Sequence, residues 1–581
     1  MDAAGRSCTR WSTWGAMAAL AVGVVLSALF LTRNVGYLFE ADSPWMLTLP
    51  NSLEWEGEPG PAASLRWTHS QTTPFLHAGF WWPRLSVRVG DDSLPIVTEA
   101  YQGGWLYWPF KLLPRDLRTR ETIRMTAALL GGLTLVLALL AFRTWWGEMP
   151  LLLAGLLACN SMFLLSFGFG YLYEALPMAA VLAAVLAGRK VRERPTAAGV
   201  LLVGFLAGLA GGLKLTALPA ALTVAGVLLG KEALANPRRA GAFVLGIFIP
   251  LLPFVVSEAT MAVAGGPSPL LSALGGGKGG FSDPAGMVSG FAMASVWTAA
   301  LPAGNGYILP MLSSGTAPAA WLLGLSAAVC LPGLAAAVLR LRRGIQDPLR
   351  DAVLAAWAVV LLLSGLLYKS GFDFQAFMTI HPLAASLVVR SLILEGRHAG
   401  LVRIRGLALG LVGAFVAVVL LHTGLSFAGG AGVSTIASLT AQQEIAGSIP
   451  DGRQVVTTSY NQAGMLRMMS GGRVDEINMD RLLSPGGDEA FFRQTVRHAF
   501  AEVTQGHPDA LYLFDLAPLP IDESREHTQF GAGISSRQVV AEEFVQAVRE
   551  AGMYSKAVAV GRGDSGTGVY ALVELKRISG L

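Results

Sequence analysis

The chain has 581 residues, of which 53% are hydrophobic and only 14% are charged, with a formal net charge of +4. These proportions are typical of multi-pass membrane proteins and exclude an ordinary soluble enzyme. The small positive charge does not indicate nucleic-acid binding, because the basic residues gather in short loops between apolar runs.

Apolar segments long enough to cross a bilayer recur through the first three quarters of the chain. A helical span needs roughly 17 to 25 such residues. The segments lie at about 13–33, 123–142, 150–168, 172–188, 197–213, 214–230, 240–262, 317–339, 352–368, 379–394 and 406–427. We therefore expect a mainly α-helical fold over residues 1–429, a polytopic bundle of about 11 transmembrane helices.

Alternate loops between these segments are rich in arginine and lysine. The basic set begins with Arg6 and Arg10 and continues at 143, 189–194, 231–239, 340–350 and 397–405. The other short loops hold little beyond Lys214 and Lys369. This positive-inside pattern predicts a cytoplasmic N-terminus, an odd number of spans and a C-terminal region in the periplasm or outside the cell. The first apolar run, at about 20 residues with no cleavage site, is expected to be a retained helix and not a signal peptide.

The long polar loop at 34–122, between the first two spans, opens with two carboxylates, Glu40 and Asp42. A carboxylate just outside a membrane helix can accept the proton of an incoming hydroxyl during sugar transfer from an activated phosphate donor. The alternative is structural, since Asp42-Ser-Pro is also a good helix start.

The same loop contains seven tryptophans, Trp105 among them. Tryptophans in such a loop either anchor it in the lipid headgroup layer or form a surface that faces sugar or lipid. His69 and His77 have no accompanying cysteine or carboxylate pattern, so we predict no metal site from them.

The loop closes on the aromatic run from Tyr101 to Phe110, which enters the second span. A first helix, an acidic residue just outside it and this run together resemble the GT-C superfamily of integral membrane glycosyltransferases. Within it, the bacterial proteins similar to protein O-mannosyltransferases and to the lipid A aminoarabinose transferase match best. The likeness covers about residues 10–230 and, more weakly, the later helices.

The resemblance implies sugar transfer at the outer face from a polyprenyl-phosphate donor, with an aspartate of the first loop as the base. The acceptor would be a glycan, a lipid or a protein. Many relatives have Asp-Glu together at the loop start, whereas this chain has Glu40-Ala-Asp42-Ser. Either carboxylate could therefore be the base.

Glu174 lies where the predicted span 172–188 begins. A charge at such a position is costly unless it meets water or a partner. It could orient the donor, hold a divalent ion together with Asp42, or simply be solvated. No cofactor is firmly implied, and a divalent metal is left open.

Four further residues are candidates for donor binding. Lys214, between two predicted spans, could pair with a lipid phosphate as a compact point charge; it could also extend to the interface with no ligand. Lys369 and His381 stand before a span at the place where the resemblance puts donor-binding residues, although a histidine at a helix start is often structural. Tyr101 joins this set through the resemblance.

A glycine-rich stretch around Lys278 lies in the loop at about 263–316. A Walker phosphate loop needs Gly-Lys followed by Ser or Thr after a strand, and neither condition holds here. We predict a flexible outer loop.

Residues 430–581 change in composition, with short strand-like runs at 454–458, 510–514, 557–560 and 568–573 and helical segments at about 487–503 and 537–551. Alternating strands and helices predict a small α/β soluble domain at the outer face. Its expected role is recognition of the acceptor or a partner.

The leading interpretation is thus a lipid-phosphate-sugar-dependent glycosyltransferase. A transporter or lipid flippase would require charges deep within the spans, which are scarce here. A non-catalytic GT-C-like assembly subunit stays open because of the departure at Glu40 and Asp42.

Overall fold

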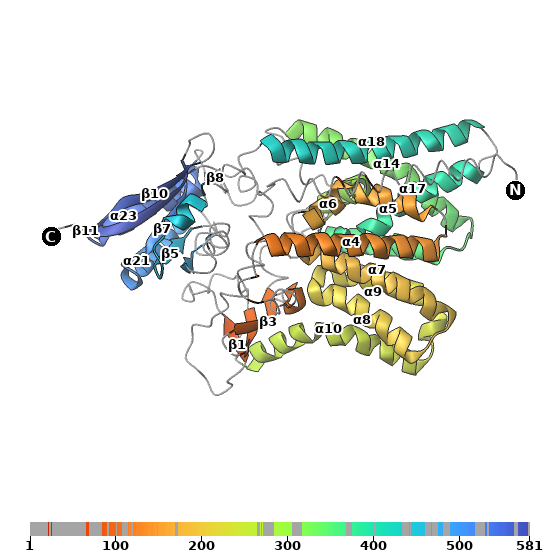
Figure 1. The fold of residues 1–581 in the computed structure, drawn as a ribbon, viewed down its shortest axis with the longest axis horizontal. Coiled ribbons are helices and arrows are strands. Elements are labelled where there is room, and N and C mark those ends of the chain that lie inside the picture. Colours follow the sequence, from red (N-terminus) through yellow and green to blue (C-terminus); the bar gives the residue numbers. More distant parts are fainter. Residues whose placement is uncertain are drawn as a thin grey trace.

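The structure is a computed structural model with two parts, a helical bundle and a smaller α/β unit (Figure 1). It describes Ala21, Val25 and residues 65–68, 84–89, 92–99, 102–106, 108, 114, 117, 120–147, 149–168, 172–263, 268, 270, 284–304, 316–367, 375–398, 402–432, 441, 443–458, 466, 474–479, 489–516, 529–530, 534–562 and 568–578.

Within these ranges, helices occupy ten of the eleven predicted apolar segments, and only Ala21 and Val25 of the first segment are among the described residues. The helices are α4 (Arg120–Trp145), α5 (Pro150–Ala158), α6 (Ser161–Gly168), α7 (Leu172–Glu193), α8 (Ala197–Leu213), α9 (Leu218–Leu234), α10 (Pro237–Val263), α14 (Thr316–Arg342), α15 (Pro348–Leu367), α17 (His381–His398) and α18 (Val402–Gly432). Six helices in the described part of the chain are long and apolar enough to cross a membrane. The chain is an integral, multi-pass membrane protein.

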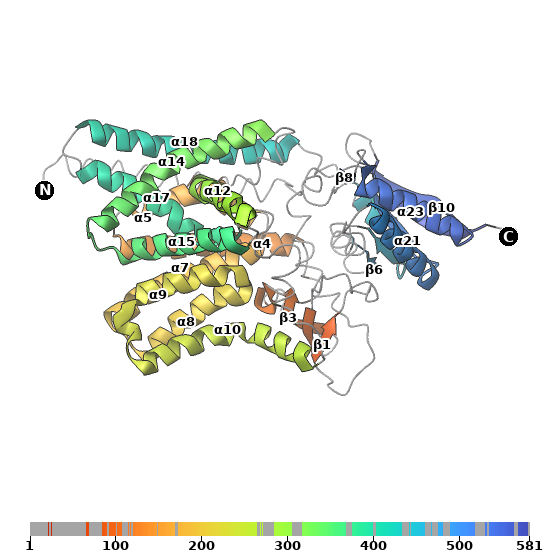
Figure 2. The ribbon, with the colours of Figure 1, turned by 180° about the vertical axis from the view of Figure 1, so that it is seen from behind.

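The bundle combines long and short helices. Helices α4, α10, α14 and α18 have 26, 27, 27 and 31 residues, whereas α8 and α9 have 17 each. At 1.5 Å per residue, the four long helices measure ~39–47 Å and the two short helices ~26 Å. In Figures 1 and 2, α4, α10 and α18 reach farther toward the C-terminal unit than α7, α8 and α9 do. We call the end of the bundle that faces this unit the loop end.

The opposite end, here the basic end, is held by ion pairs between different helices. Arg390 on α17 binds Asp347, which precedes α15, at 2.5 Å, and its guanidinium lies 4.7 Å above the ring of Trp146. The Trp146 indole N–H also donates to Asp347, at 3.3 Å. Nearby, Arg343 pairs with Glu395 at 3.0 Å. Basic residues that the loop pattern placed on one side thus occupy one end of the bundle.

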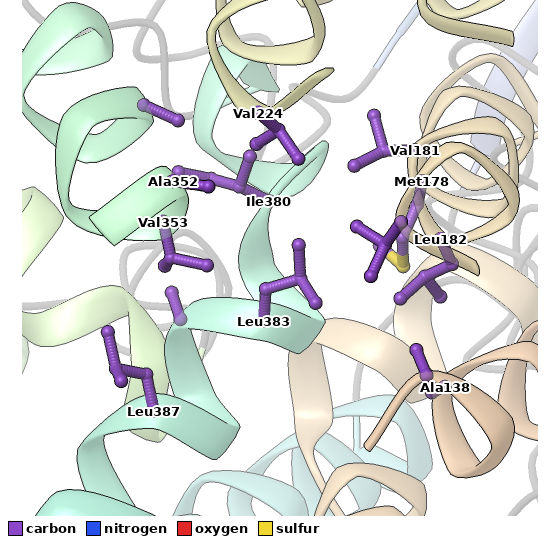
Figure 3. Packing of buried hydrophobic residues seen from close by; sticks show 14 of the residues in the cluster. Ala138, Met178, Val181, Leu182, Val224, Ala352, Val353, Ile380, Leu383 and Leu387 are labelled. Carbon is purple, nitrogen blue, oxygen red and sulfur yellow. The ribbon is translucent and has the colours of Figure 1, made fainter. Parts of the chain in front are cut away.

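The bundle core is apolar and continuous across five helices. Figure 3 shows side chains of α7, α9, α15 and α17 converging, with Ala138 of α4 at their edge. Met178, Val224, Val353 and Leu383 are all fully buried there. Burial on every side explains why these segments are uniformly apolar and lack a polar stripe.

Glycines allow α8 and α10 to pack backbone against backbone. A Cβ atom on Gly204, Gly208 or Gly212 would lie 2.4–2.5 Å from the carbonyl oxygens of Phe243, Ile247 and Pro250 respectively. The three glycines recur every four residues and therefore share one face of α8. Small residues at this spacing are the usual means by which membrane helices approach closely.

The prediction of a flexible loop over 263–316 was wrong for residues 284–303. Residues Pro284–Ala300 form α12, followed by the short 3-10 helix η5 (Leu301–Ala303). Burial increases along α12, and Leu301 at its end is fully buried. Glycine and alanine content concealed this helix, which is stabilised by packing against α14 and α15.

Buried polar side chains hold the end of this inserted segment. Asn160, between α5 and α6, donates to the Pro302 carbonyl at 3.0 Å and accepts from the Met162 backbone N–H at 3.0 Å. It therefore caps the start of α6 and joins it to η5. The ring of His422 lies against Gly304, where a Cβ atom would come within 2.4 Å of it.

His422 also joins α18 to α14, since its Nε2 lies 2.7 Å from Ser326 Oγ. Replacing Ser326 with alanine should lower the stability of the detergent-solubilised protein by about 1 kcal/mol, the usual size of an interhelical hydrogen bond in a membrane protein. Thermal unfolding measures the change. Ser295→Ala is the matched control, because the Ser295 hydroxyl bonds the Phe291 carbonyl of its own helix. Equal shifts for both variants would contradict an interhelical role.

Three sheets lie outside the bundle in the described part of the chain, and the smallest is the antiparallel pair of β8 (Gln529–Phe530) and β9 (Ile534–Ser535). The first is an antiparallel sheet of β1 (Leu65–Thr68), β2 (Arg84–Val89), β3 (Asp92–Glu99) and β4 (Gln102–Gly103), which leads into the 3-10 helix η2 (Gly104–Leu106). The second has the order β10-β11-β7-β5-β6, with parallel pairing among β7, β5 and β6 and antiparallel pairing among the others. Its strands are β5 (Gln454–Thr457), β6 (Asp475–Asn478), β7 (Leu511–Asp515), β10 (Met553–Arg562) and β11 (Gly568–Arg577).

Helices α21 (Glu489–Gly506) and α23 (Ser536–Glu550) pack beside the second sheet. The buried side chains of α21 recur at helical spacing and include Phe492, Val496 and Phe500. Between the helices, Arg493 and Arg497 both bind Glu543, at 3.0 and 2.7 Å. Strands and helices thus alternate where the sequence predicted them, with β6, β8 and β9 as additions.

Candidate functional site

The turn between α8 and α9 contains a buried lysine. Thr196 caps the start of α8, and the helix ends at Lys214, whose backbone is extended (φ −149°, ψ 114°). The 3-10 helix η4 (Leu215–Ala217) then leads into α9. Lys214 is 1% exposed, so this side chain lies inside the protein and does not extend along a lipid-facing surface. Helix α9 consequently begins four residues later than predicted.

A segment of the first loop covers this turn. A Cβ atom on Gly103 would lie 1.9 Å from the Gly212 carbonyl oxygen, so the loop backbone rests directly on the last turn of α8. The indole N–H of Trp105 donates to the Pro250 carbonyl of α10 at 2.8 Å. The Trp105 and Trp108 rings also pack together, with centroids 4.1 Å apart and planes tilted by 48°. This tryptophan is therefore bound within the protein and is not a headgroup anchor.

Lys214 lies well below the loop end. Gly212 packs against Pro250, and α10 continues 13 residues beyond Pro250 to Val263. At 1.5 Å per residue, the helix extends ~20 Å past the level of the lysine. The site is thus recessed toward the interior of the bundle.

His381 occupies a similar depth. Gly333 of α14 packs against Val388 of α17. From this contact toward the loop end, α17 runs 7 residues to His381 and α14 runs 17 residues to Thr316. The difference places His381 ~15 Å below the end of α14.

The His381 ring is fully buried, and neither of its nitrogens makes a hydrogen bond with the part of the chain that the structure describes. It follows directly on the short helix α16 (Gln375–Met378), which contacts both α7 and η4. The α16–α17 corner therefore lies beside the lysine turn. The described residues enclose this ring as they enclose the Lys214 side chain, and its role at the donor site stays a prediction.

Glu174 belongs to the first turn of α7, four residues before Met178, a residue of the buried core. Its backbone therefore lies at the loop-end border of that core, on a helix that contacts η2 and α16. Glu40, Asp42, Tyr101 and Lys369 lie outside the described residues. The catalytic and donor-binding roles of these four residues stay predictions from the sequence.

Among the residues that the structure describes, no group of three or more histidine, cysteine, aspartate or glutamate side chains could hold a metal ion. The described part of the site holds the buried Lys214 ammonium two residues after Gly212, whose backbone contacts Gly103. Such a setting strengthens electrostatic attraction to an anion, because little water screens it.

The functional features that sequence reasoning missed are Gly103 and Gly212. Lys214 was predicted from its place between two spans and the run from Tyr101 to Phe110 from its aromatic residues, and neither pattern indicated that the two glycine backbones are in contact. Two glycines that both precede a chemically interesting residue are a usable signal for close backbone approach.

No family model matches the chain, and no curated protein matches it in sequence. Among solved structures, the chain is similar to ArnT from Cupriavidus metallidurans bound to undecaprenyl phosphate, with a TM-score of 0.49 and 12% identity over 97% of this chain and 98% of that one. The apo state of the same protein gives a TM-score of 0.45 and 13% identity over 91% of this chain and 97% of that one.

The chain is also similar to the oligosaccharyltransferase of Archaeoglobus fulgidus in its apo form, with a TM-score of 0.46 and 11% identity over 86% of this chain and 69% of that one. ArnT is the lipid A aminoarabinose transferase, the type of protein that the sequence resembles. At these levels of identity and overlap, the likeness assigns no activity to this chain.

Proposed function

We propose that this chain is a membrane glycosyltransferase that moves a sugar from a polyprenyl-phosphate donor to an acceptor hydroxyl at the outer face. The observation that carries the proposal is Lys214, a buried cation at a break between two membrane helices, recessed below the loop end. A phosphate attached to a lipid tail can reach such a depth from within the membrane. A water-soluble sugar nucleotide would have to enter from the loop end and leave water to do so.

The chemistry follows from the charges. The donor is a phosphodiester with one negative charge, and transfer breaks the bond between the anomeric carbon and the phosphate oxygen. The acceptor oxygen forms the new bond, its proton goes to a carboxylate, and the polyprenyl phosphate departs as a monoester with additional negative charge. A fixed ammonium beside the departing phosphate stabilises the charge that develops in the transition state.

The first loop connects the lysine with the proposed base. Gly103 and Trp105 dock the end of this loop onto α8 and α10, directly beside the lysine turn. Glu40 and Asp42 begin the same loop, so a carboxylate and the ammonium can serve one substrate. Glu174, Tyr101 and Lys369 complete the proposed donor site around it.

The proposal places the loop end at the outer face and the basic end in the cytoplasm. The pairs formed by Arg343 and Arg390 and the arginine-rich loops lie at the basic end, which agrees with the positive-inside rule. Residues 430–581 would then form an outer-face unit that recognises the acceptor.

The direct test is transfer of radiolabelled sugar from polyprenyl-phosphate donors by membranes that carry wild type, Asp42→Asn or Glu40→Gln at matched protein levels. We expect wild type to transfer sugar and one of the two variants to lose roughly 100-fold, the contribution of a general base. Parallel assays with and without EDTA decide whether a divalent metal takes part.

If both variants match wild type, the base lies elsewhere. If wild type transfers no sugar from any donor tried, the enzyme proposal fails, and the flippase and non-catalytic interpretations take its place.

A further inference from the structure

We propose that Trp105 is the positioning residue of the lysine site: it ties the first loop to α10 and thereby fixes the backbone that carries Lys214 against a lipid phosphate. This inference rests on the proposed function, because it names the ligand of that site.

Three contacts form a closed triangle around the last turn of α8. Gly212 touches the Pro250 carbonyl on one side, and Gly103 touches the Gly212 carbonyl on the other. The Trp105 indole N–H then donates to the same Pro250 carbonyl at 2.8 Å. The end of α8 is therefore enclosed between α10 and the first loop, with the tryptophan as the link that joins the two.

This enclosure controls the position of the lysine because Lys214 follows Gly212 by two residues, at the point where the helix stops. The Lys214 backbone N–H still bonds the Ala210 carbonyl at 3.1 Å, so any tilt of the last turn is transmitted to it. Moving the loop away would leave the turn supported on one side only. The Lys214 ammonium would then no longer be held in one position.

The surroundings of Trp105 favour a positioning role over membrane anchoring. Its ring is half-buried and its N–H is bonded to a residue 145 positions away. Trp321, near the start of α14, is by contrast 81% exposed.

The test is binding of a polyprenyl phosphate to the purified full-length protein in nanodiscs. The variants are Trp105→Phe in the wild-type and Lys214→Ala backgrounds, and the matched control is Trp145→Phe. The Trp145 indole makes the same kind of bond, to the Val185 carbonyl at 2.7 Å, at the basic end of the bundle. Thermal unfolding of each variant monitors its folding.

We expect Trp105→Phe to weaken binding about 5-fold, the value of one hydrogen bond, and Trp145→Phe to leave binding unchanged. In the Lys214→Ala background, Trp105→Phe should weaken binding no further, because it acts through the lysine. If Trp105→Phe does not fold, Gly103→Ala perturbs the same triangle and should give the same result.

An unchanged affinity for Trp105→Phe, or an equal loss with and without Lys214, overturns the positioning role while the proposed function stands. If wild type and Lys214→Ala bind the lipid phosphate equally, or wild type does not bind it, the lysine site itself is wrong and both proposals fail together.

Discussion

Replacing Lys214 with alanine is expected to lower the rate of sugar transfer by about 1,000-fold. The side chain is 1% exposed, so it acts in a setting where water screens little of its charge. Removing one partner of such a desolvated charge pair costs about 2–5 kcal/mol, and a loss of about 4 kcal/mol corresponds to this factor. Because the negative charge on the phosphate increases as the sugar leaves, most of the loss should fall on kcat.

Steady-state kinetics with a polyprenyl-phosphate donor measure this effect. The matched control is Lys231→Ala, at the other end of α9, where the lysine is exposed and should not affect transfer. Lys214→Arg retains a cation of different shape and should recover part of the rate. A Lys214→Ala enzyme that keeps the wild-type kcat would exclude the lysine from the reaction.

Replacing Gly208 with valine is expected to destabilise the bundle by about 3 kcal/mol or more and to reduce the amount of folded protein. A Cβ atom there would lie 2.5 Å from the Ile247 carbonyl oxygen and 2.7 Å from its Cα, both backbone atoms that cannot turn aside. The substitution must therefore separate α8 from α10 or distort one of them, and the Gly212–Pro250 contact is lost with them.

Fluorescence-detected size-exclusion chromatography and thermal unfolding in detergent report the result. Gly226→Val is the matched control, because nothing lies within 4 Å of a Cβ atom at Gly226 in the neighbouring helix α9. A Gly208→Val protein as stable as this control would show that α8 and α10 do not pack through their glycines.

Much of the bundle could be predicted because membrane helices follow one simple rule, the length of an apolar run. Helix α8 has the predicted bounds, since Thr196 caps its start and Lys214 ends it. Helix α12 was missed because its place depends on tertiary contacts. The bond from Asn160 to Pro302 joins residues 142 positions apart, and no local pattern encodes it.

The candidate site was predictable in part for the same reason. The place of Lys214 between two apolar runs can be seen in the sequence. The contact of Gly103 with Gly212 cannot, because the two residues lie more than 100 positions apart in the chain. For His381, the position before a proline favoured donor binding, but the burial of its ring, where α17 contacts α16 and η5, could not be predicted from the sequence. The glycine repeat in α8 was visible in the sequence and would have predicted the contact with α10.

The short helices α8 and α9 have a consequence for the lipid around them. At ~26 Å each, they are shorter than the ~30 Å hydrocarbon layer of an ordinary bilayer, and Leu202 of α8 is 48% exposed. Such hydrophobic mismatch thins the adjoining leaflets. Beside α8, thinning would draw the phosphate layer of the membrane toward the level of Lys214. A polyprenyl donor could then present its headgroup to the lysine while its tail stays in hydrocarbon.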